Sequence, residues 1–418
     1  MGFQQGLSGL NASSKSLEVI GNNIANASTV GAKSARAEFA DIYANALGSA
    51  TNEVGIGVNV AAVAQQFTQG NITTTDNPLD VAINGNGFFE VSKNGAISYT
   101  RNGQFKLDNN GFIVNDQQQK LLGYPANATG TIIPGAAGPL QMPTGGIPPA
   151  VTTKIGQQLN LDARAAVTLP TAGAPIDFAD PSTYNNATSQ TVYDVRGEGV
   201  TLTYYYQKAA ADTWNVYVAA DGTPIATAGG NPAPSTTITF PPNGGAPTAP
   251  VGTVSIDIPA VANANGALTQ PITGIALDVS QATQYGSAFG VTNLTQDGYA
   301  QGQLIGVTIG SDGTVMAQYS NQQTRPAGQI ELASFRNPQG LQPLGGNAWA
   351  VTSASGNPLV GTAGSGNLGV LQSGAVEESN VDLTAELVNM ITAQRDYQAN
   401  AQTIKTQDQI LQTIVNLR

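Results

Sequence analysis

The two ends of this chain carry apolar side chains at a strict seven-residue spacing, and this pattern constrains the fold more than any other feature. At the start it predicts an amphipathic helix over residues 2–28, with Gly31 as the stop that follows it. At the end it predicts a second helix, capped by Asn380 or Asp382 and with Glu386 in its first turn. A seven-residue apolar repeat makes a stripe that must be buried against another helix.

The residues of the two stripes are the candidate packing positions. In the N-terminal helix they are Phe3, Leu7, Leu10, Leu17, Ile20 and Ile24. In the C-terminal helix they are Leu383, Leu387, Met390, Tyr397, Ile404 and Leu411. A lone helix of this length is marginal in water, so both ends need helical partners. The two ends can pack on each other or on other copies of the chain.

The outer faces of the predicted helices favour partners from other copies. The first 28 residues hold only Lys15 and Glu18 as charged side chains, and the last 39 hold ten Asn or Gln but only seven charges. Helices that face water usually carry charges on their outer side. Faces of Gln, Asn, Ser and Ala instead suit burial against several neighbours, because no ions need to be desolvated.

About 350 residues of β-type sequence lie between the two ends. Near their start, residues 35–46 are predicted to form a short helix that carries Phe39, Ile42 and Tyr43, and an extended segment follows. Residues 71–124 alternate between apolar and polar side chains, as strands do, and they contain Gly- and Asn-rich hairpin turns. This region therefore predicts an all-β body.

Composition shifts divide the β region. Residues 124–150 are rich in proline and glycine and predict a domain boundary. Residues 151–280 return to strand patterns, although 222–252 are poor in large apolar residues and are expected to form a long surface excursion. A second break is expected near 280–290, and 361–369 are expected to form a flexible lead-in to the last helix.

Composition also excludes several kinds of function. The chain has no Cys and no His, which removes thiol chemistry, disulfides, and His-based metal sites or general bases. Its net charge of −11 disfavours nucleic acid, whose phosphates need clusters of Lys and Arg. No apolar run is long enough to span a bilayer, so no membrane insertion is expected. The first 20 residues lack the features of a secretory signal.

One nucleotide-like motif needs a separate interpretation. Residues 364–369 spell GxGxxG, but the helix that should open inside such a motif starts about a dozen residues later. We therefore interpret it as a linker. Nothing in the sequence supplies a nucleophile and base pair or a calcium loop. We predict that the protein is not an enzyme and has no catalytic, cofactor-binding or metal-ligating residues.

Several motifs together resemble the bacterial flagellar rod and hook protein family. The run Val19–Asn26 and the residues after it resemble the N-terminal signature, with signature residues Asn22, Asn23, Asn26, Gly31 and Lys33. Two further runs, Asn84–Phe89 and Tyr99–Phe105, resemble shared β-domain motifs. The C-terminal signature is resembled by Ser379–Leu383, Glu386–Ile391 and the run from Gln394 to Leu417. One departure is Ala32, where the family usually has an aromatic residue.

The resemblance implies a multi-domain α+β fold with nested domains. Residues 1–28 and 379–418 would form a terminal helical core domain of coiled-coil type, lining a central channel. Residues 29–70, together with 364–378, would form a connecting segment. The inner β domain would comprise 71–145 and 284–363, and 146–283 would form an outer, all-β domain.

The resemblance also implies a function. The length and the inserted outer domain fit a hook subunit better than the smaller rod subunits. Such a subunit assembles with itself into a curved tube that works as a universal joint between motor and filament. The implied partners, besides other copies, are the distal rod protein, the hook–filament junction protein, the hook cap protein and the flagellar type III export apparatus. The implied location is the extracellular hook of the flagellum, reached without a cleaved signal peptide.

Two alternatives stay open on the sequence alone. The first is a distal rod subunit, which would be straight and rigid. The second, from a different class, is a secreted β-rich adhesin or surface protein, whose terminal helices would not be needed for assembly. Removing those helices separates the second alternative from an assembling subunit.

Overall fold

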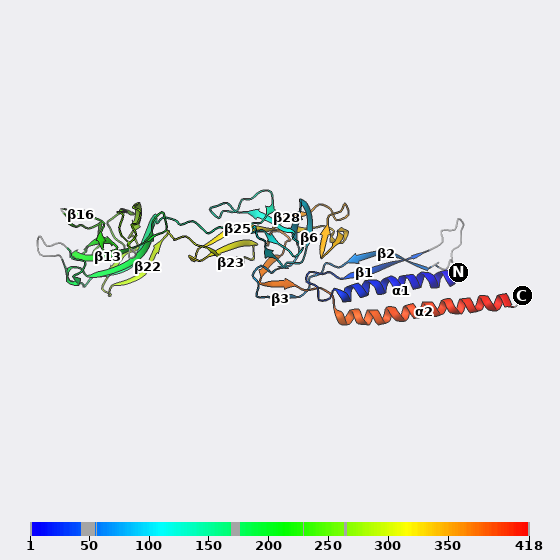
Figure 1. The fold of residues 1–418 in the computed structure, drawn as a ribbon. Coiled ribbons are helices and arrows are strands. Elements are labelled where there is room, and N and C mark those ends of the chain that lie inside the picture. The colour runs from blue at the N-terminus through cyan, green and yellow to red at the C-terminus, as the bar shows by residue number, and fades with distance from the viewer. Residues whose placement is uncertain are drawn as a thin grey trace. The chain divides into compact units, whose positions relative to one another are not determined.

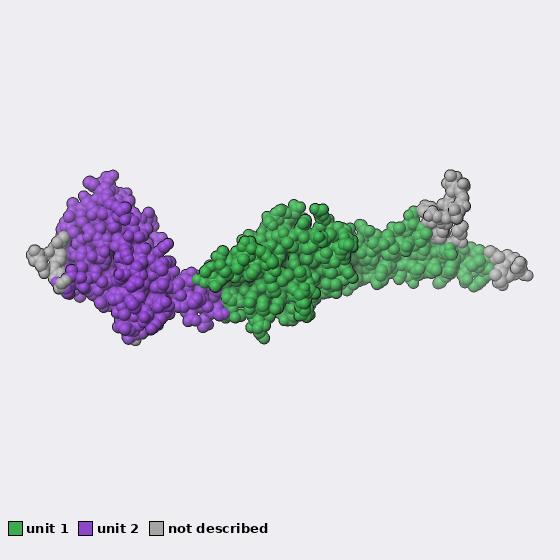
Figure 2. All heavy atoms as spheres, turned by 90° about the horizontal axis from the view of Figure 1, so that it is seen from above, with its two compact units in different colours: residues 1–144, 305–318, 324–418 green, residues 145–304, 319–323 purple. Residues whose placement is uncertain are grey.

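The computed structural model describes residues 2–42, 55, 57–168, 176–228, 230–262 and 266–416. The chain divides into two compact units, which Figure 2 shows in different colours. Unit 1 comprises residues 1–144, 305–318 and 324–418, and unit 2 comprises residues 145–304 and 319–323. The predicted boundaries between the inner and outer β domains lie at 145/146 and 283/284. The corresponding boundaries between the two units lie at 144/145 and 304/305. The predicted bounds of the inner and outer β domains stay predictions.

Both predicted terminal helices are confirmed, together with the β-rich region between them (Figure 1). Helix α1 spans Gly2–Ala25, ending three residues before its expected end, and helix α2 spans Leu383–Asn416. Of the two expected caps of α2, Asp382 is the one that acts. Its Oδ1 accepts hydrogen bonds from the backbone N–H groups of Thr384 (2.9 Å) and Ala385 (3.1 Å).

The predicted short helix at 35–46 is wrong. Residues Ala35–Ile42 form strand β1, which pairs antiparallel with strand β2, Gly57–Gln65. The remaining positions of that prediction, 43–46, lie outside the described residues. A strand depends on a partner far along the chain, and an Ala-rich run does not reveal that partner locally. Of the segment near 54–58 that is predicted to be extended, Gly57 and Val58 lie in β2, whereas 54 and 56 lie outside the described residues.

Unit 1 is built around a sheet of twelve strands, with three further two-stranded pairs. The main path runs β23-β24-β25-β9-β5-β6-β27-β26, and β10, β28, β7 and β8 attach to it. The pairs are β1–β2, β29–β4 and β3–β30. Beyond β1 and β2, the bounds are β3 Ile72–Thr74, β4 Val81–Asn84, β5 Phe88–Lys93, β6 Ala96–Thr100, β7 Lys106–Leu107, β8 Ile113–Val114, β9 Lys120–Pro125, β10 Gly138–Pro139, β23 Leu304–Ile309, β24 Thr314–Tyr319, β25 Thr324–Ser334, β26 Gln342–Gly345, β27 Ala348–Ala350, β28 Leu359–Thr362, β29 Val370–Ser373 and β30 Ala375–Glu377.

Aromatic rings hold one end of this sheet together. Phe88 on β5 packs edge-on against Phe67 (5.5 Å between ring centroids) and Trp349 (5.8 Å). Tyr99 on β6 packs edge-on against Phe335 at 4.9 Å. Such edge-to-face pairs contribute an orientation-dependent attraction, in addition to the free energy gained by burying their apolar surface. The cluster therefore holds strand β27, through Trp349, and the segment after β25, through Phe335, against the centre of the sheet.

Unit 2 contains two five-stranded sheets that share one apolar core. One sheet has the order β19-β20-β11-β21 with β22 beside β11, and the other has β12-β13-β14-β15 with β18 beside β14. Bonds between the sheets satisfy buried polar groups: Tyr206 donates to Gln157 (2.8 Å) and Trp214 to Gln284 (2.7 Å). The strands are β11 Lys154–Asp162, β12 Asn186–Tyr193, β13 Gly199–Ala210, β14 Thr213–Ala220, β15 Thr223–Pro224, β16 Thr227–Ala228, β17 Asn231–Pro232, β18 Thr236–Thr239, β19 Val254–Ile258, β20 Ile272–Asp278, β21 Thr283–Tyr285 and β22 Gly290–Gln296.

The interpretation of 222–252 as a surface excursion is wrong in part. Strand β18 lies in this segment and pairs with β14. Ile238 is fully buried and Phe240 is 2% exposed, both in the core of unit 2. Two apolar residues that alternate with threonines were enough to place the strand, although the segment as a whole is poor in them.

The expected flexible lead-in at 361–369 is also wrong. Gly364–Gly369 forms a closed turn between β28 and β29, in which Gly364 N–H donates to Gly369 O (2.9 Å). Gly369 N–H donates to Asn86 O (2.7 Å), which fastens the turn to the β4–β5 loop. A Cβ on Gly369 would lie 2.4 Å from Asn84 O, so this close approach requires glycine. Because a strand rather than a helix follows, the motif lacks the geometry of a nucleotide site.

Two carboxylates lie side by side inside the sheet of unit 1. Glu90 on β5 is 6% exposed and Glu331 on β25 is 3% exposed, and the antiparallel pairing of β5 with β25 places them next to each other. Glu331 accepts a hydrogen bond from the Tyr124 hydroxyl (2.7 Å), whereas Glu90 Oε2 has no partner. Burial, and then the charge of Glu331, raise the pKa of Glu90 to about 7.

The Glu90 carboxyl predicts a pH-dependent stability. In the unfolded chain it ionises near 4.5, but in the fold only near 7. The unfolded state therefore loses its proton first, so unfolding becomes easier as pH rises from about 4.5 to 7. The shift of about 2.5 pKa units sets an upper limit on this loss of about 3.5 kcal/mol, at roughly 1.4 kcal/mol per unit.

Glu90→Gln should remove this loss, stabilising the protein at pH 8 and leaving it nearly unchanged at pH 4. Urea unfolding at both values, with the exposed Glu378→Gln as control, measures the effect. Equal stability of the variant and the wild type at pH 8 would contradict a buried, strained carboxylate at this position.

Candidate functional site

The two terminal helices pack antiparallel against each other (Figure 1). At one end of the pair, Asn23 Nδ2 of α1 donates to Glu386 Oε1 of α2 (3.2 Å). At the other end, Gly6 of α1 faces Ile404 of α2. Residues early in α1 thus meet residues late in α2, so the start of α1 and the end of α2 lie at the same end of the pair.

Glycines on α1 let the helices approach closely. A Cβ on Gly6 would lie 3.0 Å from Ile404 Cγ1, and a Cβ on Gly9 would lie 2.8 Å from Asn400 Oδ1. Positions three apart share one helix face, so Gly6 and Gly9 form a single small-residue contact. Through this face α1 meets Ile404, one of the predicted stripe residues of α2, and Asn400.

The β1–β2 hairpin lies along α1 on a different side from α2 (Figure 1). Gln5 Nε2 donates to Gly55 O at 2.6 Å. Ser8 Oγ accepts the N–H of Val58 at 3.3 Å. The helix therefore has partners on two sides within one chain, and its remaining side is open.

The structure covers the predicted stripe residues unequally. Only Ile20 is buried, at 8% exposure. The half-buried ones are Leu10, Leu17, Ile24, Met390 and Ile404. The exposed ones are Phe3, Leu7, Leu383, Leu387, Tyr397 and Leu411. One copy of the chain thus leaves a large part of both stripes uncovered, which is unusual for a chain that works alone.

The uncovered apolar surface of α2 is concentrated in its first turns. Leu383, Leu387, Val388 and Ile391 are between 46% and 59% exposed. These side chains lie within three turns of the capped end. Contiguous exposed apolar surface of this kind marks sites where another protein surface packs.

The predicted signature residues lie at and just after the end of α1, and they connect that end to the rest of unit 1. We call these residues, Asn22, Asn23, Asn26, Gly31 and Lys33, and the groups that they contact the collar. The side-chain amide of Asn23 makes two hydrogen bonds to the backbone of Ala35, one to its oxygen (2.8 Å) and one from its N–H (2.9 Å). Asn26 Nδ2 donates to Asn22 O (2.9 Å), which satisfies a carbonyl at the helix end.

Gly31 is not the stop of the helix, as the sequence predicts, because α1 ends six residues earlier, at Ala25. Its role in the collar is a close approach to another segment of the backbone. Its φ is +71°, and a Cβ there would lie 2.6 Å from Asn102 N. Its N–H donates to Glu377 O at 2.8 Å. A residue with a side chain would therefore be strained and would push the β6–β7 loop away.

The centre of the collar is a buried ionic cluster that sequence reasoning identified only in part. Lys33 Nζ lies 2.6 Å from Glu377 Oε1, and Arg101 Nη1 lies 3.1 Å from Glu377 Oε2. The Lys33 and Glu377 side chains are fully buried and that of Arg101 is 4% exposed. Burial lowers the pKa of Lys33, and the negative charge of Glu377 opposes this shift.

Hydrogen bonds to backbone groups connect this ionic cluster to segments that lie far apart in the chain. Lys33 Nζ also donates to Thr68 O (2.8 Å), and the N–H of Gly70 donates to Glu377 Oε1 (2.9 Å). Asn380 then accepts the N–H of Ser34 (2.7 Å) and donates to Gln66 O (2.8 Å). The end of α1, the end of β2 and the start of α2 are therefore held by one polar network.

Four contributors to this arrangement were not predicted, namely Gly6, Gly9, Arg101 and Glu377. The spacing of the two glycines on one helix face was a usable signal. The Tyr99–Phe105 motif contained Arg101, but its role depends on Glu377, which lies 276 residues away. No local pattern reveals a pairing of that kind.

In the part of the chain that the structure describes, no group of three or more acidic side chains is placed to hold a metal ion. Neither described helix is apolar enough over a sufficient length to cross a membrane. What this region does provide is a rigid attachment of two helices whose apolar stripes are partly uncovered. That arrangement suits packing of helices from several copies.

Family models match the chain in four segments. Residues 3–33 match the flagella basal body rod protein family, and 372–417 match its C-terminal counterpart, the flagellar basal body rod FlgEFG protein C-terminal family. Residues 82–172 match the flagellar hook protein FlgE/F/G D1 domain, and 160–299 match the flagellar basal body protein FlaE D2 domain.

Full-length relatives match end to end. The flagellar hook protein FlgE of Salmonella typhimurium strain LT2 is 46% identical over 421 residues, covering all of both chains. The protein of the same name from Escherichia coli K12 is 45% identical with the same coverage. That of Rhizobium meliloti is 34% identical, covering all of this chain and 98% of the relative. A crystal structure of Helicobacter pylori flagellar hook protein FlgE2 has a similar fold, with a TM-score of 0.52 and 15% identity over 72% of this chain and 99% of that one.

Proposed function

Because this chain belongs to the flagellar hook protein FlgE family, we propose that it is the structural subunit of the bacterial flagellar hook. Many copies assemble into a curved helical tube that acts as a universal joint, passing motor torque to the filament. The observation that carries this proposal is the pair of terminal helices, rigidly held by the collar but with exposed Phe3, Leu7 and Leu387.

The helices supply the continuity that torque needs. In the tube, the stripes of α1 and α2 pack against those of neighbouring copies in a core of coiled-coil type. The stripe residues named above, half-buried and exposed, are the proposed subunit-packing positions. The collar, with Asn22, Asn23, Asn26, Gly31 and Lys33, passes load from this core to the β sheet of unit 1.

The alternatives are less well supported. A distal rod subunit would not need unit 2, and the full-length relatives carry the name of the hook protein rather than of a rod protein. A secreted adhesin would have no use for helices with uncovered stripes at both ends. The family is structural, and no catalytic role is proposed.

Assembly with further copies of itself within the basal body and hook follows from the family. More specifically, the distal rod protein would adjoin the first copies and the hook–filament junction protein the last. The hook cap protein would cover the growing end. The flagellar type III apparatus would export the chain to the extracellular hook without cleavage of a signal peptide.

The universal-joint function predicts separate roles for the two units. A chain that joins Thr144 directly to Ile305, and closes the turn at 319–323 with a short linker, should still form tubes because its helices and collar are intact. Unit 2 has a polar surface that disfavours large apolar contacts, so we expect it to set curvature rather than to hold the tube together.

Electron microscopy of tubes from the excised chain, beside wild type, tests this division. Straight tubes, or tubes with altered curvature, are the expected result, with reduced motility. Tubes of unchanged curvature would move the determinant of bending into unit 1. Failure of the excised chain to fold would show that the unit boundary is misplaced.

A further inference from the structure

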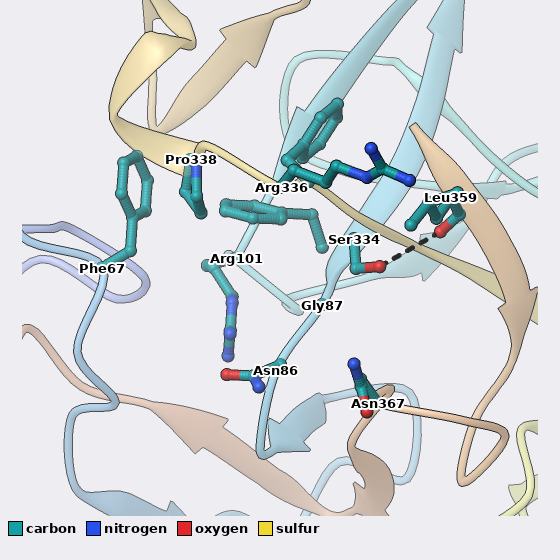
Figure 3. A pocket seen from close by; sticks show the side chains of 11 residues that line it. Phe67, Asn86, Gly87, Arg101, Ser334, Arg336, Pro338, Leu359 and Asn367 are labelled. Carbon is teal, nitrogen blue, oxygen red and sulfur yellow. Dashed lines mark hydrogen bonds between the residues drawn. The ribbon is translucent and has the colours of Figure 1, made fainter. Parts of the chain in front are cut away.

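A pocket of about 250 Å³ opens in unit 1 between the aromatic cluster and the Gly364–Gly369 turn (Figure 3). It is smaller than the usual range of sites for drug-sized ligands, roughly 300–1,000 Å³, but it has room for one side chain. Its apolar wall includes Phe67 and Phe88. Its polar lining comes from Asn86, Arg101, Ser334, Arg336 and Asn367, and no carboxylate lines it.

One polar group that lines the pocket, Arg101, belongs to an ionic cluster whose charges do not balance. Arg101 is 3% exposed and its Nε has no hydrogen-bond partner. Its guanidinium bonds to Glu377 and to Gly85 O (2.9 Å), but Glu377 is shared with the buried Lys33. Two buried cations therefore meet one carboxylate, and the surplus positive charge lies against the pocket.

The rim of the pocket adds polar side chains that have no bonding partner in the described part of the chain. The side chains of Asn86, Arg336 and Asn367 make no hydrogen bond or ion pair among the described residues. Figure 3 shows Arg336 near Leu359 at one end of the opening, and Asn86 with Asn367 at the other. Ser334 Oγ donates to Leu359 O at 3.4 Å and is thereby directed along the rim.

We propose that this pocket receives an Asp or Glu side chain from a neighbouring copy in the tube. Its two arginines and two free amides suit a carboxylate, which accepts several hydrogen bonds at once. Its aromatic wall suits the methylene part of the same side chain. The chain has 27 acidic but only 16 basic side chains, so neighbouring copies present a surplus of carboxylates.

The inference rests on the proposed function, since only an assembly brings a second copy to the pocket. The occupant adds the anion that the Lys33–Glu377–Arg101 cluster lacks. It also links the collar of one copy to the surface of the next. Contacts between copies of this kind are heterologous, as a helical tube requires.

Arg336→Glu tests the proposal without touching the collar. It should raise the concentration of free subunit in equilibrium with tubes at least about tenfold, as expected for reversing one side of a close charge pair. Lys93→Glu makes the same charge change on β5 outside the pocket and should change that concentration less than about twofold. Thermal unfolding of both monomers should match wild type. An equal effect of the two variants would overturn the proposal.

Photocrosslinking identifies the occupant. Leu359, which is 55% exposed at the rim, is replaced by p-benzoylphenylalanine in the full chain. Irradiated tubes, but not monomers, should give crosslinked dimers whose partner peptide contains Asp or Glu. Changing that acid to Lys should restore assembly of Arg336→Glu. Tubes that form without this crosslink, or a partner peptide without an acid, would refute the inference while leaving the hook function intact; absence of wild-type tubes would refute the function itself.

Discussion

Leu387→Asp is expected to abolish tube formation while leaving the monomer folded. Leu387 is 46% exposed in the single chain, so a carboxylate there remains in water and costs the monomer little. In the tube that we propose, the same position lies in a stripe that neighbouring helices cover. Burying an unpaired carboxylate at every copy costs several kcal/mol per contact, and the cost recurs along the whole polymer.

Sedimentation after induced assembly measures this effect, with circular dichroism as the check on folding. The control is Val251→Asp, which also replaces an aliphatic side chain by Asp, at a position in unit 2 that is 93% exposed. It should assemble like wild type. Removing residues 2–28 or 384–418 should act like Leu387→Asp. Normal tubes from Leu387→Asp or from either truncated chain would contradict assembly through the helices.

Glu377→Gln is expected to destabilise unit 1 by about 3–5 kcal/mol, because removing one partner of a buried ion pair leaves uncompensated charge. Here the single carboxylate serves both Lys33 and Arg101, and it also accepts the N–H of Gly70. Lys33→Met should cost much less, since it leaves Glu377 paired with Arg101. Urea unfolding of the purified monomers measures both changes.

The pH dependence of Glu377→Gln provides an internal check. Burial already lowers the pKa of Lys33 from 10.5, and losing the carboxylate lowers it further. Between the folded-state pKa and 10.5 the unfolded state then binds more protons, so stability rises with pH in that window. In the wild type the same rise begins at a higher pH, because Glu377 keeps the pKa of Lys33 higher there. The deficit of the variant should therefore shrink between the folded-state pKa of Lys33 in the variant and that in the wild type. A stability loss no larger than that of Glu378→Gln would show that the cluster does not hold the collar.

Local patterns predicted those parts of the fold that are decided locally. The terminal helices followed from apolar periodicity, and the cap Asp382 was one of the two candidates. The hairpin across Asp108–Gly111 followed from its turn residues: Asp108 Oδ1 accepts the N–H groups of Asn110 and Phe112, both at 2.8 Å. In each case the deciding interactions lie within a few residues.

The failures share a physical cause, which is dependence on partners far along the chain. The sequence of strand β1 favours a helix, because its partner β2 and the face of α1 that it covers are not visible in that sequence. The sequence of the 361–369 turn favours a flexible lead-in, because the hydrogen bond that fastens the turn to Asn86 is long-range. The collar was found through Lys33 and Gly31, but its central acid, Glu377, was not.

The stripes themselves were identified, but one chain cannot reveal which of their residues meet another copy. The contact between α1 and α2 uses Gly6 and Gly9, and it leaves Phe3, Leu7 and Leu387 exposed. That partition depends on the whole packing of α1 between α2 and the hairpin. It is the feature of the structure that most directly points to assembly.

Electron microscopy of the purified wild-type assembly tests the central claim most directly. The account predicts a curved tube of uniform length whose inner wall is built from α1 and α2, with Phe3, Leu7 and Leu387 buried between copies. Straight, rigid rods would favour a rod subunit over a hook subunit. Single chains, or a tube in which those three side chains still face water, would contradict assembly through the terminal helices.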